Sequence, residues 1–147
     1  MSTKVTVKFV MMQGCDDLRP GKAHHDDAAY DLRSRQETLL PTGKPGLIPT
    51  GLFLEIPSGF EAQVRPRSGL AIKHSLTVLN TPGTIDSGYR GEVCVIMLNA
   101  GSEPYLIHRG DRIAQMVINE LPDVELVQVK ELADSNRGAG GFGSTGR

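Results

Sequence analysis

"LNTPGTIDSGYRGEVCVIMLN" (residues 79–99) places two turn-forming segments immediately before an apolar run. The turn residues of "NTPG" and "DSGYRG" enclose the short "TI", and "EVCVIMLN" (92–99) is rich in β-branched and aliphatic side chains. Such side chains favour strands, while Gly, Pro, Asn and Asp favour the turns between them. This stretch therefore predicts short strands joined by tight turns.

The same rhythm continues outward along the chain. Further β-like segments are "GLFLEIP" (51–57), "FEAQVRP" (60–66), "YLIH" (105–108), "RIAQMVINEL" (112–121) and "VELVQVKEL" (124–132). An alternating apolar pattern from Val5 to Met11 predicts one more strand. Only "SGLAIKH" (68–74) favours a short helix, with Ser68 as a possible N-cap. Repeated short strands with turn signals indicate an all-β barrel or sandwich with one short helix.

Length and composition predict a single domain. The chain has 147 residues, which suits one domain. We expect one β-barrel domain over residues 1–132 and a flexible C-terminal tail over residues 133–147, which is rich in glycine. No repeat and no internal domain boundary is visible.

Charge and cysteine content exclude several classes of partner. The formal net charge is −1, with mixed signs along the chain, so neither nucleic acid nor an anionic membrane is an expected partner. No apolar stretch approaches the roughly 20 residues of a membrane helix. The first residues lack the apolar block and cleavage site of a signal peptide, and there are two cysteines. We therefore expect a soluble cytoplasmic protein, with Cys94 as a buried small hydrophobe.

Two stretches carry candidate anion and metal chemistry. In "AAYDL" (28–32), Asp31 has either a solvated strand position or a role in binding a metal-bound water or an arginine. In "RPRSGLA" (65–71), Arg67, Ser68 and Gly69 meet at a loop-to-helix junction, where free backbone N–H groups favour an anion. An ordinary helix cap with a solvated arginine is the alternative there.

Two further stretches are candidates for a base and for ligand contacts. Asp86 follows the apolar Ile85, so it could be partly desolvated and act as a base towards water, with Tyr89 facing the same cleft. The alternative is a β-hairpin whose Asp caps its turn. Gln115, in "HRGDRIAQMV" (108–117), needs a hydrogen-bond partner if it is buried, either a ligand or neighbouring backbone.

Two other patterns carry less weight. "HHDD" (24–27) matches no standard zinc spacing, so a polar loop is expected there. The tail "RGAGGFGSTGR" (137–147) contains G-x-G-x-x-G, but this motif binds dinucleotides only between a strand and a helix. The arginines, phenylalanine and serine of the tail are unusual for a purely flexible end.

Taken in order, these stretches resemble the five motifs of the trimeric dUTPases. The matching segments are "AAYDL", "PRSGLA", "NTPGTIDSGYRGEV", "RGDRIAQMV" and "RGAGGFGSTG", which together span residues 28–146. One departure is Ala29, where many members carry glycine, and it should have little effect. The resemblance implies a jelly-roll-like subunit and hydrolysis of dUTP to dUMP and pyrophosphate, which limits uracil in DNA and supplies dUMP for dTMP synthesis.

The resemblance also implies a role for each motif. Asp86 would activate the water that attacks the α-phosphorus. Mg²⁺ would bind the triphosphate without protein ligands in its first shell, and Asp31 would touch a metal-bound water. The phosphates would be bound by Arg67, Ser68, Gly69 and Gln115. The uracil edge would be read by Asn80, Gly83, Thr84 and Ile85, and the deoxyribose would contact Tyr89. The tail that closes over the nucleotide would contribute Arg137, Phe142, Gly143 and Ser144.

Within that set, Tyr89 would pack under the deoxyribose and reject UTP. Phe142 would stack on the uracil, and Arg137 would approach the γ-phosphate. The family's sites are shared between subunits, so a homotrimer is implied.

Two alternatives remain open on the sequence. A dCTP deaminase shares the fold, but that family places a glutamate where Ile96 stands here. A non-catalytic nucleotide-binding module would keep the binding groups and could lose the water-activating acid, whereas Asp86 is present.

Overall fold

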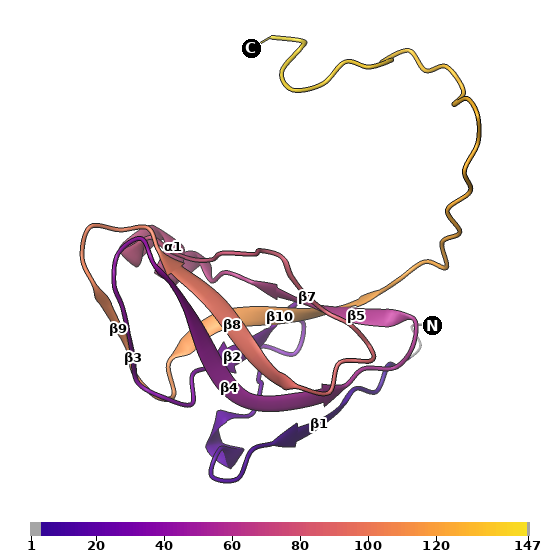
Figure 1. Cartoon of the computed structure of the whole chain (residues 1–147). Coiled ribbons are helices and arrows are strands. Elements are labelled where there is room, and N and C mark those ends of the chain that lie inside the picture. Colours follow the sequence, from indigo (N-terminus) through magenta and orange to yellow (C-terminus); the bar gives the residue numbers. More distant parts are fainter. Residues whose placement is uncertain (1–3, 147) are drawn as a thin grey trace.

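The computed structural model describes residues 4–146, which form ten strands, one α-helix and one 3-10 turn (Figure 1). In chain order the elements are β1 (Lys8–Met11), η1 (Asp16–Leu18), β2 (Tyr30–Arg33), β3 (Thr38–Leu40), β4 (Pro45–Glu55), β5 (Phe60–Arg65), α1 (Ser68–His74), β6 (Leu76–Val78), β7 (Gly83–Ile85), β8 (Glu92–Asn99), β9 (Tyr105–Ile107) and β10 (Arg112–Glu120). Within this range the single α-helix, with seven residues, is far too short to cross a membrane.

Two four-stranded sheets make up the body of the protein. One has the strand order β1-β4-β8-β6 and the other β2-β10-β5-β7, while β3 and β9 form a separate two-stranded ribbon. Neighbouring strands are antiparallel throughout. The predicted all-β, jelly-roll-like class with one short helix is confirmed.

The alternation of β8 explains how these sheets share one core. Val93, Val95 and Met97 are buried, while the intervening residues are only partly covered. Burying an apolar side chain of this size contributes about 1.5–3 kcal/mol. Asn99 is also fully buried, and its side-chain amide donates hydrogen bonds to two backbone carbonyls, so this polar group is satisfied.

A bulge in β4 ties the start of β8 to the rest of the fold. Pro49 pairs with Cys94 and Phe53 with Glu92, so three residues of β4 lie opposite one residue of β8. At the bulge the N–H of Gly51 donates to Glu92 Oε2 at 2.8 Å. Arg35 donates to the same carboxylate from Nε at 2.7 Å and from Nη2 at 3.1 Å.

Several expectations about local structure are confirmed. The helix at residues 68–74 and the strand at residues 92–99 have the predicted bounds. The segments at residues 51–57, 60–66, 105–108 and 112–121 correspond to β4, β5, β9 and β10.

Three expectations are wrong. Residues 124–132 form no strand, because nothing in the described part of the chain, residues 4–146, pairs with them, and Leu126 and Leu132 are 93% and 87% exposed. Ser68 is the first helical residue rather than the N-cap, which is Arg67 without a side-chain cap. Cys94 is only partly buried because it lies on the outward face of β8, whereas Cys15 is buried.

Candidate active site

Five of the predicted residues line one polar pocket of about 350 Å³: Asp31, Arg67, Ser68, Gly69 and Gln115. Strand register explains why they meet. Gln115 on β10 lies opposite Asp31 on β2 and opposite Arg65 at the end of β5. Arg67, Ser68 and Gly69 follow β5 directly and begin α1. The pocket therefore forms where β2, β10 and β5 meet the helix.

Opposite charges face each other inside this pocket. Asp31 Oδ1 lies 3.6 Å from Arg67 Nε, and Asp31 Oδ2 lies 3.7 Å from Arg112 Nη1. Arg67 also donates from Nη1 to the carbonyl of Arg112 at 3.1 Å. Two guanidinium groups therefore flank the Asp31 carboxylate, and a guanidinium group can bind two phosphate oxygens at once.

The side chain of Gln115 has a backbone partner. Its Nε2 donates to the carbonyl of Pro66 at 2.9 Å. Of the two partners considered from the sequence, a ligand or neighbouring backbone, this donor therefore has the backbone. The bond fixes Gln115 against the loop that carries Arg67. The amide still lines the pocket beside the arginine.

A second group of predicted residues lies on β7 and the turn that follows it. Gly83, Thr84 and Ile85 pair with Val64, Gln63 and Ala62 on β5. A side chain at position 83 would meet Asn80 at 3.4 Å, so glycine there lets the asparagine pack closely on the strand.

Asp86 begins a tight turn, because the N–H of Tyr89 donates to its carbonyl at 3.1 Å. Both side chains are exposed, and the Asp86 carboxylate has no hydrogen bond within residues 4–146. The expectation that Asp86 is partly desolvated is therefore wrong for the single chain, because no other element within the described residues covers this turn.

The two groups lie far apart in one chain. Ile85 is opposite Ala62, so Asp86 is level with Glu61, six residues from Arg67. Six residues of extended chain span about 20 Å. One chain therefore does not bring Asp86 to the pocket that contains Arg67.

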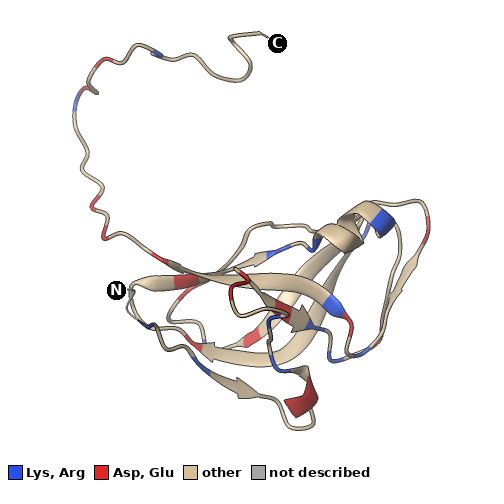
Figure 2. Ribbon diagram, turned by 180° about the vertical axis from the view of Figure 1, so that it is seen from behind, with Lys and Arg blue, Asp and Glu red and all other residues tan. Residues whose placement is uncertain are grey.

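The predicted tail residues form a third group. Beyond β10 the chain leads away from the sheets in both views (Figures 1 and 2). Phe142 is fully exposed, and Arg137 Nε donates to the carbonyl of Gly140 at 2.7 Å within the tail itself. Gly143 and Ser144 take part in the turns of this segment. None of the four contacts the polar pocket in this structure.

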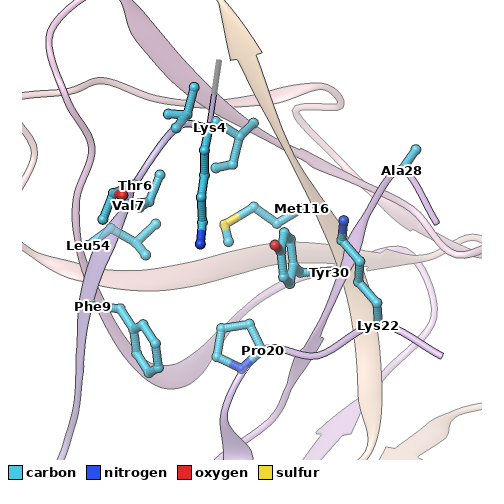
Figure 3. A pocket seen from close by; sticks show the side chains of 12 residues that line it. Lys4, Thr6, Val7, Phe9, Pro20, Lys22, Ala28, Tyr30, Leu54 and Met116 are labelled. Carbon is cyan, nitrogen blue, oxygen red and sulfur yellow. The ribbon is translucent and has the colours of Figure 1, made fainter. Parts of the chain in front are cut away.

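The structure also contains a larger hollow that includes none of the predicted residues. It measures about 460 Å³ and lies beside β1 and β2, with Leu54 and Met116 among its apolar lining (Figure 3). Tyr30 lies at its edge, with Lys22 Nζ 4.6 Å from the ring centroid. Its lining is mainly apolar, which suits covering by apolar side chains more than phosphate binding.

Metal-binding residues do not gather anywhere in the described range. Across residues 4–146, no three His, Cys, Asp or Glu side chains form a cluster suited to a metal ion. In "HHDD" (24–27), Asp27 instead closes a turn, since its Oδ2 accepts from the backbone N–H of His24 at 2.9 Å.

Two charged residues of the pocket were not predicted from the sequence. Asp27 and Arg112 also line the polar pocket. Arg112 begins β10 three residues before Gln115, and its membership of the "RGDRIAQMV" motif was a usable signal. Asp27 stands just before "AAYDL", but nothing in its local pattern separates it from a solvated loop residue.

Comparisons with known proteins identify the family of this chain. A family model described as dUTPase matches residues 19–146. A deoxyuridine 5'-triphosphate nucleotidohydrolase from Anaeromyxobacter sp. (strain Fw109-5) is 58% identical over the whole of both chains. One from Solibacter usitatus is 59% identical over 132 residues, which cover 88% of this chain and 89% of the relative.

Solved structures give the same result at lower identity. The Staphylococcus bacteriophage 80alpha dUTPase with dUPNHPP superposes with a TM-score of 0.83 at 29% identity, covering 97% of this chain and 99% of that one. A variant dUTPase from phage phi11 of S. aureus, described as revealing the coordination of a structural Mg(II) ion, has a TM-score of 0.77 at 27% identity, with 86% and 97% covered. Because the family model matches most of its length, this chain belongs to the dUTPase family.

Proposed function

We propose that this protein hydrolyses dUTP to dUMP and pyrophosphate through a water molecule activated by Asp86. The observation that carries the proposal is the convergence of Asp31, Arg67 and Gln115 on one polar pocket, fixed by the register of β2, β10 and β5. The family to which the chain belongs gives the substrate class.

The phosphates of dUTP would bind in the polar pocket. Arg67 can contact two phosphate oxygens at once, a geometry that lysine cannot reproduce. The backbone N–H groups of Ser68 and Gly69 at the start of α1, together with the Ser68 hydroxyl and the Gln115 amide, add hydrogen-bond donors. These donors would also stabilise negative charge that develops on the leaving pyrophosphate.

The donor set fits a magnesium ion held mainly by the substrate. The pocket has two carboxylates, Asp27 and Asp31, and Asp31 is flanked by two guanidinium groups, which makes it a poor direct ligand for a cation but able to orient metal-bound water. When bound, Mg²⁺ would neutralise phosphate charge and fix the triphosphate for in-line attack. Asp31 is the residue that would hold its water.

In the proposed reaction, Asp86 accepts a proton from water as the water oxygen attacks the α-phosphorus. The bond to the bridging oxygen of the leaving group breaks, so pyrophosphate departs and dUMP remains. Asn80 and the β7 backbone at Gly83, Thr84 and Ile85 would read the uracil edge. Tyr89 would pack under the deoxyribose and exclude a 2′-hydroxyl.

We further propose that complete sites form between subunits of a homotrimer. A shared site is supported by the single chain, in which Arg67 lines the polar pocket and Asp86 does not. The exposed apolar side chains of residues 124–132 support it too, because such a segment is stable in water only when another surface covers it. The apolar hollow beside β1 offers a surface of that kind.

The tail would close over bound nucleotide. Phe142 can stack on a flat base, and Arg137 can reach a terminal phosphate. Ordering costs roughly 1–2 kcal/mol per residue in backbone entropy, so closure needs both contacts. Gly143 and Ser144 would let the backbone approach the ligand closely. Residues 133–147 are the proposed tail.

The two alternative functions have less support. A deaminase would need an acid–base group near position 96, which is an isoleucine on the outward side of β8. A pure binding module would have no use for an aspartate at position 86. We propose a cytoplasmic enzyme that keeps uracil out of DNA and provides dUMP for dTMP synthesis.

Product analysis tests the proposal. The protein is incubated with Mg²⁺ and, separately, with dUTP, UTP, dTTP, dCTP and dATP. Pyrophosphate and dUMP from dUTP alone are expected. Ammonia released from dCTP would establish the deaminase, and tight dUTP binding without turnover would establish the binding module.

A further inference from the structure

We propose that Gly91 is a positioning residue that sets the place of the Tyr89 ring and thereby the discrimination between deoxyribose and ribose. This inference rests on the proposed function, in which Tyr89 packs under the sugar. Gly91 itself would touch no part of the nucleotide and would act only through the tyrosine.

The ring of Tyr89 folds back over the backbone of Gly91. A Cβ atom at position 91 would lie 2.6 Å from Tyr89 Cζ and 2.9 Å from Cε1, closer than carbon atoms pack. The Tyr89 hydroxyl donates to the carbonyl of Glu92 at 2.9 Å. The missing side chain at position 91 and this hydrogen bond together define where the ring lies.

The residue whose backbone carbonyl accepts that hydrogen bond is also held through its side chain. The Glu92 carboxylate accepts from Arg35 Nε at 2.7 Å and from the Gly51 N–H at 2.8 Å. Glu92 is therefore anchored at the base of the turn by contacts to Arg35 and to the β4 bulge. Because Tyr89 bonds to the backbone of Glu92, this anchor also restrains the Tyr89 ring.

Alanine at position 91 would displace the ring without disturbing the fold. The backbone of Gly91 is outside the left-handed region, so alanine is allowed there. To restore ordinary carbon contacts of about 3.6 Å, the ring must retreat by about 1 Å. Tyr89 is 47% exposed, so it can move into solvent rather than strain the core.

Such a shift would take the ring out of the position in which it is proposed to pack under the deoxyribose. A ring packed against C2′ rejects a 2′-hydroxyl by contact, and a displacement of about 1 Å at such a contact can change rates by up to about 100-fold. We expect Gly91→Ala to lower the ratio of kcat/KM for dUTP to that for UTP by roughly tenfold or more.

Gly88 provides a matched control. It lies in the same turn, has no left-handed backbone, and a Cβ there meets nothing within 4 Å. The wild type, Gly88→Ala, Gly91→Ala, Tyr89→Ala and the Tyr89→Ala/Gly91→Ala double variant are compared for kcat and KM with both nucleotides and for melting temperature.

The inference is supported if Gly91→Ala loses selectivity, Gly88→Ala keeps it, and Gly91→Ala has no further effect once Tyr89 is alanine. It is overturned if a folded, active Gly91→Ala keeps selectivity within about twofold of wild type. If Gly91→Ala does not fold, Tyr89→Phe serves instead, because it frees the ring from Glu92. Unchanged selectivity in Tyr89→Phe would then overturn the inference. Failure of the wild type to hydrolyse dUTP would count against the proposed function instead.

Discussion

Arg67 and Asp31 form an ion pair in the polar pocket, with 3.6 Å between Nε and Oδ1 and both side chains about one quarter exposed. A triphosphate would compete with this carboxylate for the arginine. Binding of the phosphates would therefore free Asp31 to accept hydrogen bonds from metal-bound water. The two residues should act as a coupled pair rather than independently.

Asp31→Asn should weaken the response to magnesium. The amide has no charge with which to orient metal-bound water, so we expect the Mg²⁺ concentration for half-maximal dUTP hydrolysis to rise roughly tenfold. Titration of activity with Mg²⁺ at saturating dUTP measures this. Glu37→Gln, an exposed carboxylate paired with His108 outside the pocket, is the control. An unchanged titration in Asp31→Asn would contradict the assignment.

Asp86→Asn should abolish most turnover while binding survives. Loss of a general base costs about 10²- to 10⁴-fold in kcat. Because Asp86 is exposed and makes no hydrogen bond among the described residues, the change should not disturb the fold. Steady-state kinetics and calorimetry with a non-hydrolysable dUTP analogue separate the two effects. If the variant keeps a tenth of the activity or more, another group activates the water.

Strong local patterns made part of the fold predictable. β8 alternates apolar and partly covered positions over its whole length, and its bounds follow from the flanking "RGE" and "NAG". The helix at residues 68–74 follows a proline and has no competing pattern. The apolar run at residues 124–132 has a similar pattern to β8, yet it forms no strand, because a strand also requires a partner that local sequence cannot specify.

The site was predictable in its residue types more than in its geometry. Asp31, Arg67 and Gln115 meet through strand register, which depends on pairings across the whole chain. The exposure of Asp86 in the single chain was wrongly predicted because desolvation depends on what covers a turn, and residues 4–146 of the same chain place nothing over it. Arg112 belongs to the same motif as Gln115, but only the tertiary structure shows that it lies against Asp31.

Glu92→Gln should destabilise the protein in a pH-dependent way. The hydrogen bond from Arg35, followed by that from the Gly51 N–H, holds the pKa of Glu92 below its usual value, despite partial burial. Stability from this ionised group is therefore present above the ordinary glutamate pKa and is lost as the pH falls through the lowered pKa. At pH 7 we expect a loss of about 1–3 kcal/mol, or several degrees in Tm.

Melting curves of wild type and Glu92→Gln from pH 7 to pH 3 test this, and the difference in Tm should shrink at the acidic end. Glu55→Gln is the control, because Glu55 pairs with Lys8 at 3.3 Å on the surface. Such an exposed pair contributes little. Equal effects of both substitutions would show that Arg35 and Glu92 do not form a special anchor.

Phe142→Trp should report closure of the tail. The chain contains no tryptophan, so this substitution provides a single fluorophore. Stacking on uracil should change its emission when a non-hydrolysable dUTP analogue and Mg²⁺ are added, and not with the corresponding dCTP analogue. Removal of residues 137–147 should lower kcat/KM for dUTP at least tenfold. If the tryptophan emission does not change when the dUTP analogue is added, residue 142 does not contact the nucleotide.

Substitution in the exposed apolar segment should disrupt the assembly. Leu126→Asp combined with Val129→Asp places charges where an apolar partner surface is expected, whereas Lys130→Ala in the same segment leaves that surface intact. We expect a trimeric mass by light scattering for wild type and for Lys130→Ala, and a monomeric mass for the double variant. Because Asp86 does not line the pocket that contains Arg67 in one chain, the monomer should also lose dUTP hydrolysis. A monomeric wild type with full activity would refute the shared site, since one chain would then complete the chemistry by itself.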